Sequence, residues 1–305
     1  MSTPSRAPSR IRRFTGLAAV TAATGLLIAA CGSGTTDSGM SGMNHSSTPM
    51  TSASSTTGMP GMDDMPSGDG LTAESSGFRF TPTTTTLPTG QPASFTFRIT
   101  DSGGAAVTAF EPDQTKLMHF YLIRSDLTGF QHTHPTMAAD GTWTAPLATA
   151  QPGTYRAYAS FITKDTTGKA IPLVLSQQIT VPGTAATTPV PAASTTTQVD
   201  GYTLTLANDQ LMAGMSHNLT VTVSKDGQPV TDLQPYLDTY AHLTAFHDGD
   251  LAFAHLHPHG KVNGDHGGPA LTFEAMLPKP GNWRLVLQFQ TGGALHTAAV
   301  TITVS

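Results

Sequence analysis

Residues 242–258 read HLTAFHDGDLAFAHLHP, in which alternating apolar positions flank Asp248-Gly249. Asp-Gly between such runs is a strong indicator of a two-residue type I′ turn. The stretch therefore predicts a β-hairpin in which His242 lies directly across from His255, with Cβ atoms about 5 Å apart. His257 follows two residues later and points to the same face as His255. Three imidazoles are thus expected on one face of one hairpin.

The same landmarks occur earlier in the chain, in the same order. His119 precedes His132 by the spacing that separates His242 from His255, and His134-Pro135 follows as His257-Pro258 does. Downstream, a Pro-Gly-x-aromatic-Arg motif recurs, at 152–156 and at 280–284. Ordered landmarks of this kind indicate an internal duplication. The turn between His119 and His132 is less diagnostic, so its register rests on the analogy.

Both copies have the residue pattern of β-strands. Short runs rich in β-branched and aromatic residues recur between Gly, Pro, Asn and Asp, and no segment keeps a helical period. We predict an all-β protein with two tandem immunoglobulin-like antiparallel β-sandwich domains. The domains are expected at 71–183 and 198–305, joined by a linker at 184–197 that reads largely Thr, Ala and Pro. The residues expected in the cores are Phe130, Phe161, Phe253, Phe289, Trp143 and Trp283.

The amino terminus has the organisation of an export signal. Four arginines precede an apolar run from Leu17 to Ala30, which is too short for a comfortable membrane span. The sequence Leu27-Ile28-Ala29-Ala30-Cys31 resembles a lipobox. We therefore predict a lipoprotein signal peptide at 1–30, lipidation of Cys31, and a folded part anchored at the outer face of a membrane. An ordinary secretory signal is the alternative, and the export route stays open between the general and the twin-arginine pathways.

Composition narrows the possible functions. A net charge of −5 gives no support to nucleic-acid binding. Cys31 is the only cysteine, so the folded part has neither a disulfide nor a cysteine-based metal site. Metal chemistry must come from His, Met and carboxylates. The sequence contains no G-x-S-x-G, no H-E-x-x-H and no phosphate loop, and we expect no enzyme.

The two histidine triads are the candidate metal sites, because imidazole is a ligand for copper, zinc and nickel. Copper is the expected cofactor and zinc is possible. The loop 258–269 carries two further histidines that are candidates for additional ligands. The alternative is that the histidines are structural and bind no metal. The predicted ligands are His119, His132, His134, His242, His255 and His257, with His259 and His266 as additional candidates.

Residues 31–70 are rich in Ser, Thr, Gly and Met, and we expect a disordered tether because they contain too little apolar surface to fold. Methionine is normally a core residue, yet here it recurs at spacings of three. Its thioether is a soft ligand that suits Cu(I). A low-complexity linker that tolerates Met is the alternative. The candidate ligands in this tether are Met40, Met43, Met59, Met62 and Met65.

The repeated His…Phe-x-His-x-His-Pro motif, followed by Pro-Gly-x-aromatic-Arg, resembles the YtkA-like domains of exported bacterial proteins. The resemblance covers about residues 72–305 and implies a β-sandwich fold in a copper or heavy-metal context, with the six triad histidines as the positions of interest. It leads us to expect a surface lipoprotein that sequesters copper or passes it to a copper-handling partner. A metal-free surface binding or adhesion module is the alternative.

Overall fold

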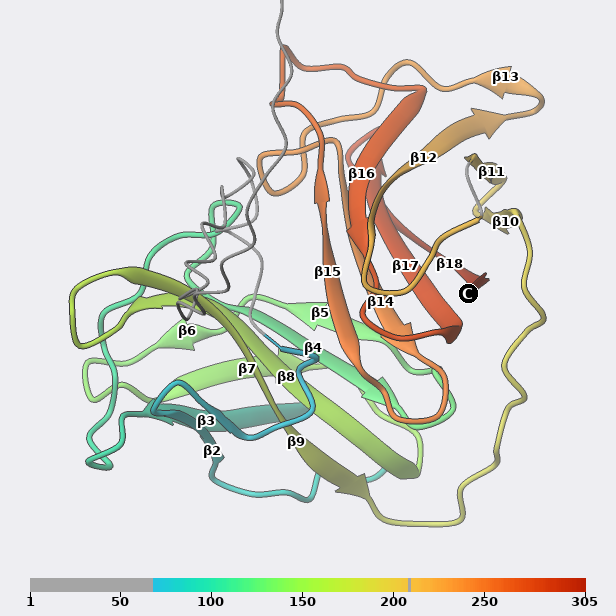
Figure 1. Cartoon of the computed structure of the whole chain (residues 1–305). Coiled ribbons are helices and arrows are strands. Elements are labelled where there is room, and N and C mark those ends of the chain that lie inside the picture. The colour runs from blue at the N-terminus through green and yellow to red at the C-terminus, as the bar shows by residue number, and fades with distance from the viewer. Residues whose placement is uncertain (1–67, 208–209) are drawn as a thin grey trace, which may run out of the picture. The chain divides into compact units, whose positions relative to one another are not determined.

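The structure is a computed structural model, and it describes residues 68–207 and 210–305. Figure 1 shows that the regular elements of these residues are strands. No helix in this part of the chain is long and apolar enough to cross a membrane. The predicted signal peptide, the lipidation of Cys31 and the methionine ligands of the tether lie outside the described residues. They stay predictions.

The first repeat is a sandwich of two antiparallel sheets. One sheet has the order β1-β2-β3-β7-β6 and the other has the order β5-β4-β8-β9. The strands are β1 (Glu74–Ser75), β2 (Phe78–Pro82), β3 (Ala93–Thr100), β4 (His119–Arg124), β5 (Gln131–Thr133), β6 (Thr136–Met137), β7 (Trp143–Leu147), β8 (Gly153–Lys164) and β9 (Ala170–Val181).

The second repeat has the same layers. Strands β10, β11, β12 and β16 correspond to one sheet of the first repeat, and β15, β14, β17 and β18 correspond to the other. Here β15 pairs with both β14 and β16, which joins the two layers into one nine-stranded sheet. The strands are β10 (Thr196–Val199), β11 (Tyr202–Ala207), β12 (Ser216–Lys225), β13 (Gln228–Pro229), β14 (Ala241–His247), β15 (Phe253–Pro258), β16 (Ala270–Met276), β17 (Gly281–Thr291) and β18 (Ala294–Val304).

Each repeat has its own apolar core, formed by alternate residues of its strands. In β3 the inward positions Phe95, Phe97 and Ile99 are buried, whereas the residues between them are more exposed. Trp143 lies in the first core and Trp283 in the second, each almost completely buried. Burial of one such side chain contributes roughly 1.5–3 kcal/mol. The prediction of two tandem immunoglobulin-like sandwiches is confirmed.

A third apolar cluster contains residues of both repeats. Strands β4 and β14 are buried on both faces: Phe120 and Leu122 face the first core, whereas Tyr121 and Ile123 face the second repeat. The ring of Tyr121 lies 5.2 Å from that of Phe253, measured between centroids. Phe253 therefore packs between the repeats and not in the core of its own sandwich. The cluster consists of Tyr121, Ile123, Leu127, Tyr158, Val174, Phe246, Leu251, Phe253 and Val286.

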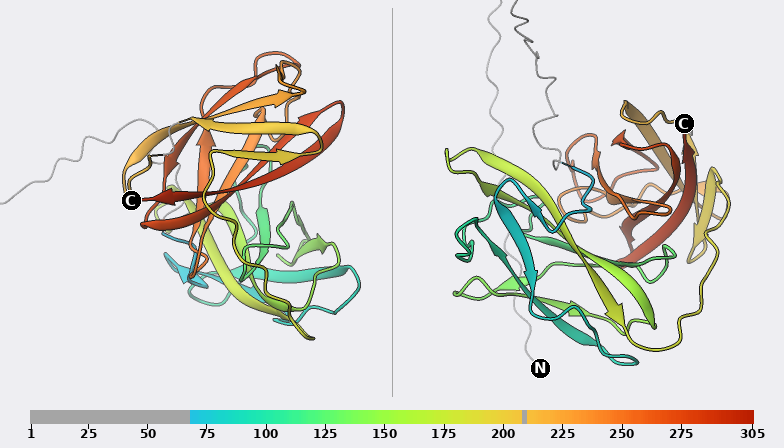
Figure 2. Two further views of the ribbon diagram at one scale, coloured as in Figure 1. Left: turned by 90° about the vertical axis from the view of Figure 1, so that its right-hand side faces the viewer. Right: turned by 60° about the horizontal axis from the view of Figure 1, so that its bottom comes forward.

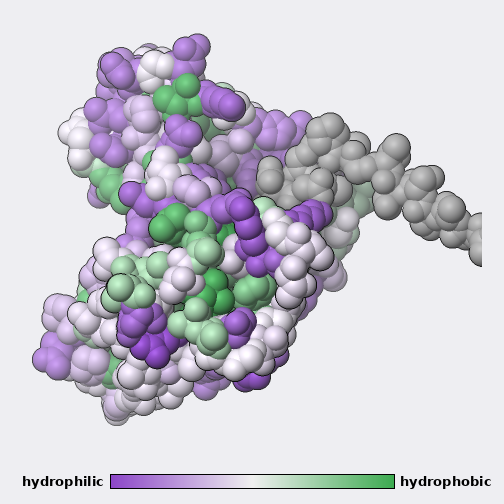
Figure 3. Space-filling view, turned by 90° about the vertical axis from the view of Figure 1, so that its left-hand side faces the viewer, coloured by the Kyte–Doolittle hydropathy of each residue, from purple (hydrophilic) through white to green (hydrophobic). Residues whose placement is uncertain are grey.

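The segment that joins the repeats runs from β9 to β10 as an extended stretch without strand pairing, as the views in Figure 2 show. A buried ion pair holds it in place. Arg124 contacts Asp126 at 2.6 Å, with side chains that are 11% and 7% exposed. The backbone N–H of Thr188 donates to Asp126 at 3.0 Å. The face drawn in Figure 3 is largely polar or neutral, with hydrophobic residues gathered toward its middle.

Candidate metal centre

The hairpin of the second repeat positions its histidines in a register that differs from the predicted one. His255 lies across from Thr244 and Leu256 across from Leu243. The expectation that His242 lies directly across from His255 is wrong. The turn is wider than two residues, because Asp250 accepts from the N–H of Ala252 and contacts the ring of His247. The hairpin of the first repeat has the equivalent register, with His132 across from Tyr121.

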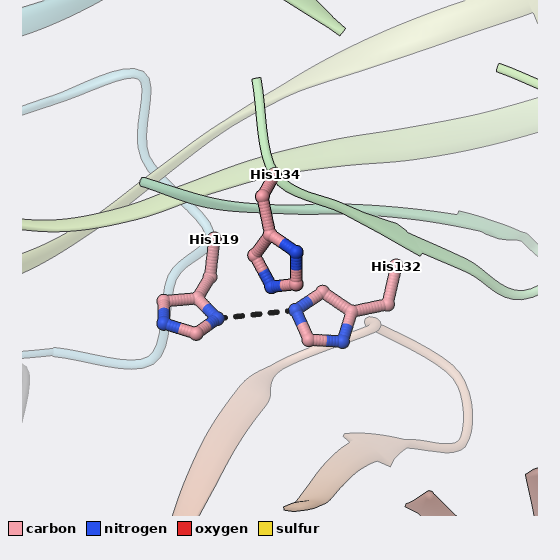
Figure 4. Close-up of side chains that lie close together, drawn as sticks. All are labelled: His119, His132 and His134. Carbon is pink, nitrogen blue, oxygen red and sulfur yellow. Dashed lines mark hydrogen bonds between the residues drawn. The ribbon is translucent and has the colours of Figure 1, made fainter. Parts of the chain in front are cut away.

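In the first repeat three histidines converge on one point (Figure 4). His119 begins β4, His132 lies in β5, and His134 follows β5 directly. One ring nitrogen of each lies within 4.8 Å of those of the other two. His119 is fully buried, and the other two are half-buried. The ring centroid of His134 lies 5.1 Å from that of His119 and 4.7 Å from that of His132.

Hydrogen bonds at the far side of two rings fix where their lone pairs point. Nε2 of His119 donates to the backbone carbonyl of Asp113 at 3.0 Å, which leaves the lone pair on Nδ1. Nδ1 of His132 donates to Oε1 of Gln288 at 2.7 Å, which leaves the lone pair on Nε2. Gln288 belongs to the second repeat and is 5% exposed. Partners of this kind orient the imidazole ligands of metal sites.

The two lone pairs then face each other. Nδ1 of His119 and Nε2 of His132 are 3.1 Å apart, the contact that is dashed in Figure 4. With Oε1 of Gln288 facing the ring, two neutral acceptors face each other, and a cation between them would satisfy both; with the amide turned over, Nε2 of His132 instead donates to Nδ1 of His119. Two nitrogens that bind one metal ion at about 2.0–2.1 Å and a tetrahedral angle lie about 3.3 Å apart. The observed separation therefore suits two ligands of one ion.

Burial disfavours the proton. It lowers the pKa of His119. Burial, and then the neighbouring His119 and His134, hold the pKa of His132 well below its usual range. Burial lowers the pKa of His134 to about 4, and its Nε2 is buried without a hydrogen-bond partner. All three rings are thus neutral near pH 7, which is the form that binds metal.

The second triad does not form a separate site of the same kind, because its members have different partners. His242 is 1% exposed, and both of its nitrogens are engaged. Nδ1 contacts Oε1 of Gln114 at 2.7 Å, and Nε2 contacts the hydroxyl of Tyr121 at 2.8 Å. The ring of His242 stacks on those of His119 and His132, with centroids 5.4 and 4.7 Å apart.

His255 and His257 lie beside His242 on the same sheet face. The ring centroid of His255 is 4.7 Å from that of His242 and 5.0 Å from that of His257. The six triad histidines, expected as two separate groups, therefore form one buried histidine cluster between the repeats. His259 and His266 are exposed, and neither belongs to the group of close ring nitrogens found among the described residues.

Gln114, Gln288 and Tyr121 are cluster residues that the sequence reasoning missed. Each repeat provides one glutamine to the histidines of the other: Gln288 bonds to His132, and Gln114 bonds to His242. Tyr121 could have been found, because it lies two residues after His119 and so points to the same face. No sequence pattern indicates the two glutamine contacts, since they form only where the repeats meet.

Two immunoglobulin-like sandwiches joined through a shared histidine cluster define a duplicated, all-β class of protein. The chain belongs to the family described as Domain of unknown function (DUF8832), whose model matches residues 73–176 and 197–305. The duplication is therefore confirmed. The match gives no support to the YtkA-like resemblance of the motif. No curated protein matches the chain.

Several solved structures resemble the fold at low identity. The adhesin FdeC of Escherichia coli has 16% identity over 76% of this chain and 65% of its own, with a TM-score of 0.23. A DUF4785 family protein of Legionella pneumophila has 12% identity over 74% and 55%, with a TM-score of 0.26. The D0-D1 domain of intimin has 13% identity over 74% and 96%, with a TM-score of 0.22. The chain thus spans less than two thirds of the first two structures, and these scores transfer no activity to it.

Proposed function

We propose that this chain is an extracytoplasmic binding protein, not an enzyme, in which His119, His132 and His134 hold a transition-metal ion. The observation that carries the proposal is the convergence of one ring nitrogen from each histidine within 4.8 Å, with those of His119 and His132 3.1 Å apart, in a site that disfavours a proton. A bound cation would join these nitrogens and also provide a partner for the buried Nε2 of His134.

Copper is the proposed ion, and zinc is the competitor. Three imidazoles suit either Cu(II) or Zn(II). The methionines at 40–65 favour copper, because the thioether is a soft ligand that suits Cu(I). With Cys31 as a lipid anchor, the protein would sequester copper at the outer face of a membrane or pass it to a copper-handling protein.

The test is a competition titration of the full chain with Cu(II), Cu(I) and Zn(II), beside the variant His119→Ala/His132→Ala/His134→Ala. The matched control is His259→Ala/His266→Ala, which removes two exposed histidines outside the cluster. We expect the triad variant to lose one tightly bound Cu(II) and the control variant to keep it. Equal Cu(II) binding by all three proteins would refute the site.

The second candidate is a metal-free surface binding or adhesion module whose histidines hold the repeats together. Both nitrogens of His242 have hydrogen-bond partners within the protein, which favours a structural role for this residue. FdeC is an adhesin, which agrees better with this candidate, and the metal proposal stands on the histidine geometry alone. This candidate predicts that histidine variants lower the melting temperature equally with and without a chelator.

A further inference from the structure

Two histidines outside the first triad have ring nitrogens without a partner. His255 is 2% exposed, and its Nδ1 is buried with no hydrogen bond. Nε2 of His257 is buried and unpartnered as well. A buried polar atom without a partner costs about 1–3 kcal/mol. Two such atoms on neighbouring rings, with centroids 5.0 Å apart, indicate a shared ligand.

Gln114 determines which nitrogen of His255 is available. Its amide contacts Nδ1 of His242 through Oε1 and Nε2 of His255 through Nε2, at 2.7 and 3.4 Å. The oxygen and nitrogen of an amide have nearly the same shape, and the group can turn over. In the turned orientation Oε1 accepts from Nε2–H of His255, and the lone pair of that ring lies on Nδ1. His242 then accepts from Gln114 and donates to the hydroxyl of Tyr121. Each of these three contacts then has one donor and one acceptor, and Nδ1 of His255 is free to bind a ligand.

A soft ligand lies on the neighbouring strand. Strands β15 and β16 pair only at His257–Glu274 and Pro258–Phe273. Toward His255 the pairing stops, and an open cavity of about 510 Å³ begins there. His255 and Met276 both line it. Met276 lies two residues beyond Glu274 in β16, so it is on the same sheet face as Glu274 and His257.

The only ammonium group that lines this cavity is already neutralised. Nζ of Lys279 pairs with Asp69 at 2.9 Å and with Asp250 at 2.7 Å. Asp69 also lines the cavity and is held by this ammonium group, and the apolar lining includes Phe253, Ala254 and Pro278. Such surroundings favour an ion of low charge that binds nitrogen and sulfur over a strongly hydrated divalent ion.

We propose that Nδ1 of His255, Nε2 of His257 and the thioether of Met276 form a second metal site that is selective for a soft monovalent ion, Cu(I). This site is separate from the first triad, and His242 is not one of its ligands. Two imidazoles and a thioether bind Cu(I), whereas Zn(II) prefers a further nitrogen, oxygen or thiolate in place of the thioether. The site does not depend on the proposed function, because it shares no ligand with the first triad.

The test is Cu(I) stoichiometry, measured with a competing chelator on the full chain in a background that disables the first site by His119→Ala/His132→Ala. The same background removes the tether thioethers by replacing the methionines at 40, 43, 50, 59, 62 and 65 with leucine. We expect one Cu(I) per chain to remain bound in this background. His257→Ala should abolish it, and Met276→Leu should weaken it at least tenfold. Binding of Zn(II) should be unaffected by Met276→Leu. The matched control is Met215→Leu, which changes an exposed methionine.

X-ray absorption gives an independent readout: copper–sulfur scattering should be present in the background variant and absent after Met276→Leu. Two outcomes overturn the second site. One is that the background variant, folded by circular dichroism, binds no Cu(I). The other is that Met276→Leu and His257→Ala leave Cu(I) affinity unchanged. If Cu(I) binding survives in the background while wild-type chain binds no additional Cu(II), the second site stands and the first is refuted.

Discussion

Replacing Gln288 with leucine tests whether the second repeat controls the metal site of the first. The 2.7 Å bond from Nδ1 of His132 to Oε1 of Gln288 holds the lone pair on Nε2, where it faces His119. Leucine has a similar volume and accepts no hydrogen bond. Loss of such an orienting partner typically reduces metal affinity tenfold to a hundredfold. This corresponds to about 1.4–2.8 kcal/mol of binding free energy.

The assay is a Cu(II) competition titration of Gln288→Leu, together with nitrogen-15 NMR of the imidazoles, which reports the tautomer of His132. Gln288→Glu keeps an acceptor and should retain most of the affinity. Gln290→Leu, two residues further along β17, serves as the control. The reasoning is refuted if Gln288→Leu binds Cu(II) as tightly as the wild type, or if it binds more weakly while the tautomer of His132 stays the same.

Three further predictions concern stability without metal. Burial lowers the pKa of several cluster histidines, so below about pH 6.5 the unfolded chain takes up protons that the folded chain does not. In the presence of a chelator, the free energy of unfolding should therefore be constant above this pH. Below it, the free energy should fall by about 1.4 kcal/mol per pH unit for each such histidine. Equal free energies from urea unfolding at pH 7.5 and pH 5.5 would contradict this. Thr244→Val should raise the urea midpoint, because the hydroxyl of Thr244 is buried without a hydrogen-bond partner. Removing it should remove a desolvation cost of about 1–3 kcal/mol, and a lower midpoint would contradict this. Asp126→Ala leaves Arg124 buried and unpaired and should cost about 3–5 kcal/mol by urea unfolding. Asp140→Ala breaks an exposed pair with Arg98 and should leave the urea midpoint nearly unchanged; similar losses for the two variants would show that burial does not decide the effect.

The strands could be predicted from the sequence because each sandwich buries one face of each strand. Apolar residues such as Phe95, Phe97 and Ile99 alternate with more exposed residues, and this alternation in the sequence indicates the buried face. The duplication could also be predicted, because His119 and His242 are followed by the same His-x-His-Pro motif at the same spacing. Both features depend on residues that are close in sequence or repeated in order.

The hairpin register could not be predicted, because Asp248-Gly249 is a local preference that other contacts override. The N–H of Asp248 donates to the carbonyl of Asn282 in the neighbouring strand, and Asp250 anchors the far side of the turn. These bonds favour a wider turn over the two-residue type I′ turn. Tertiary contacts therefore determine the register, and the local sequence around Asp248-Gly249 does not indicate them.

The shared cluster could not be predicted for a related reason. Strand β14 reads as a half-buried strand, yet it is buried on both faces because the second face packs on the other repeat. The local sequence pattern does not indicate which surface covers this second face of β14. The partners of the histidines, Gln114 and Gln288, depend on this contact, so the histidines could be listed as candidate ligands while their grouping could not.

The stacking of His119 on His242 has a consequence for how the arrangement arose. These are equivalent positions of the two repeats, and their rings are 5.4 Å apart and within 5° of parallel. Equivalent residues touch only near a two-fold axis, as at the centre of a symmetric homodimer. In a homodimer the same residue must serve on both sides of that axis. Within one chain this constraint does not apply. Tyr121 of the first repeat is equivalent to Thr244 of the second, and Gln288 of the second repeat is equivalent to Ser160 of the first. The equivalent surfaces of the two repeats therefore differ in their residues and fit each other.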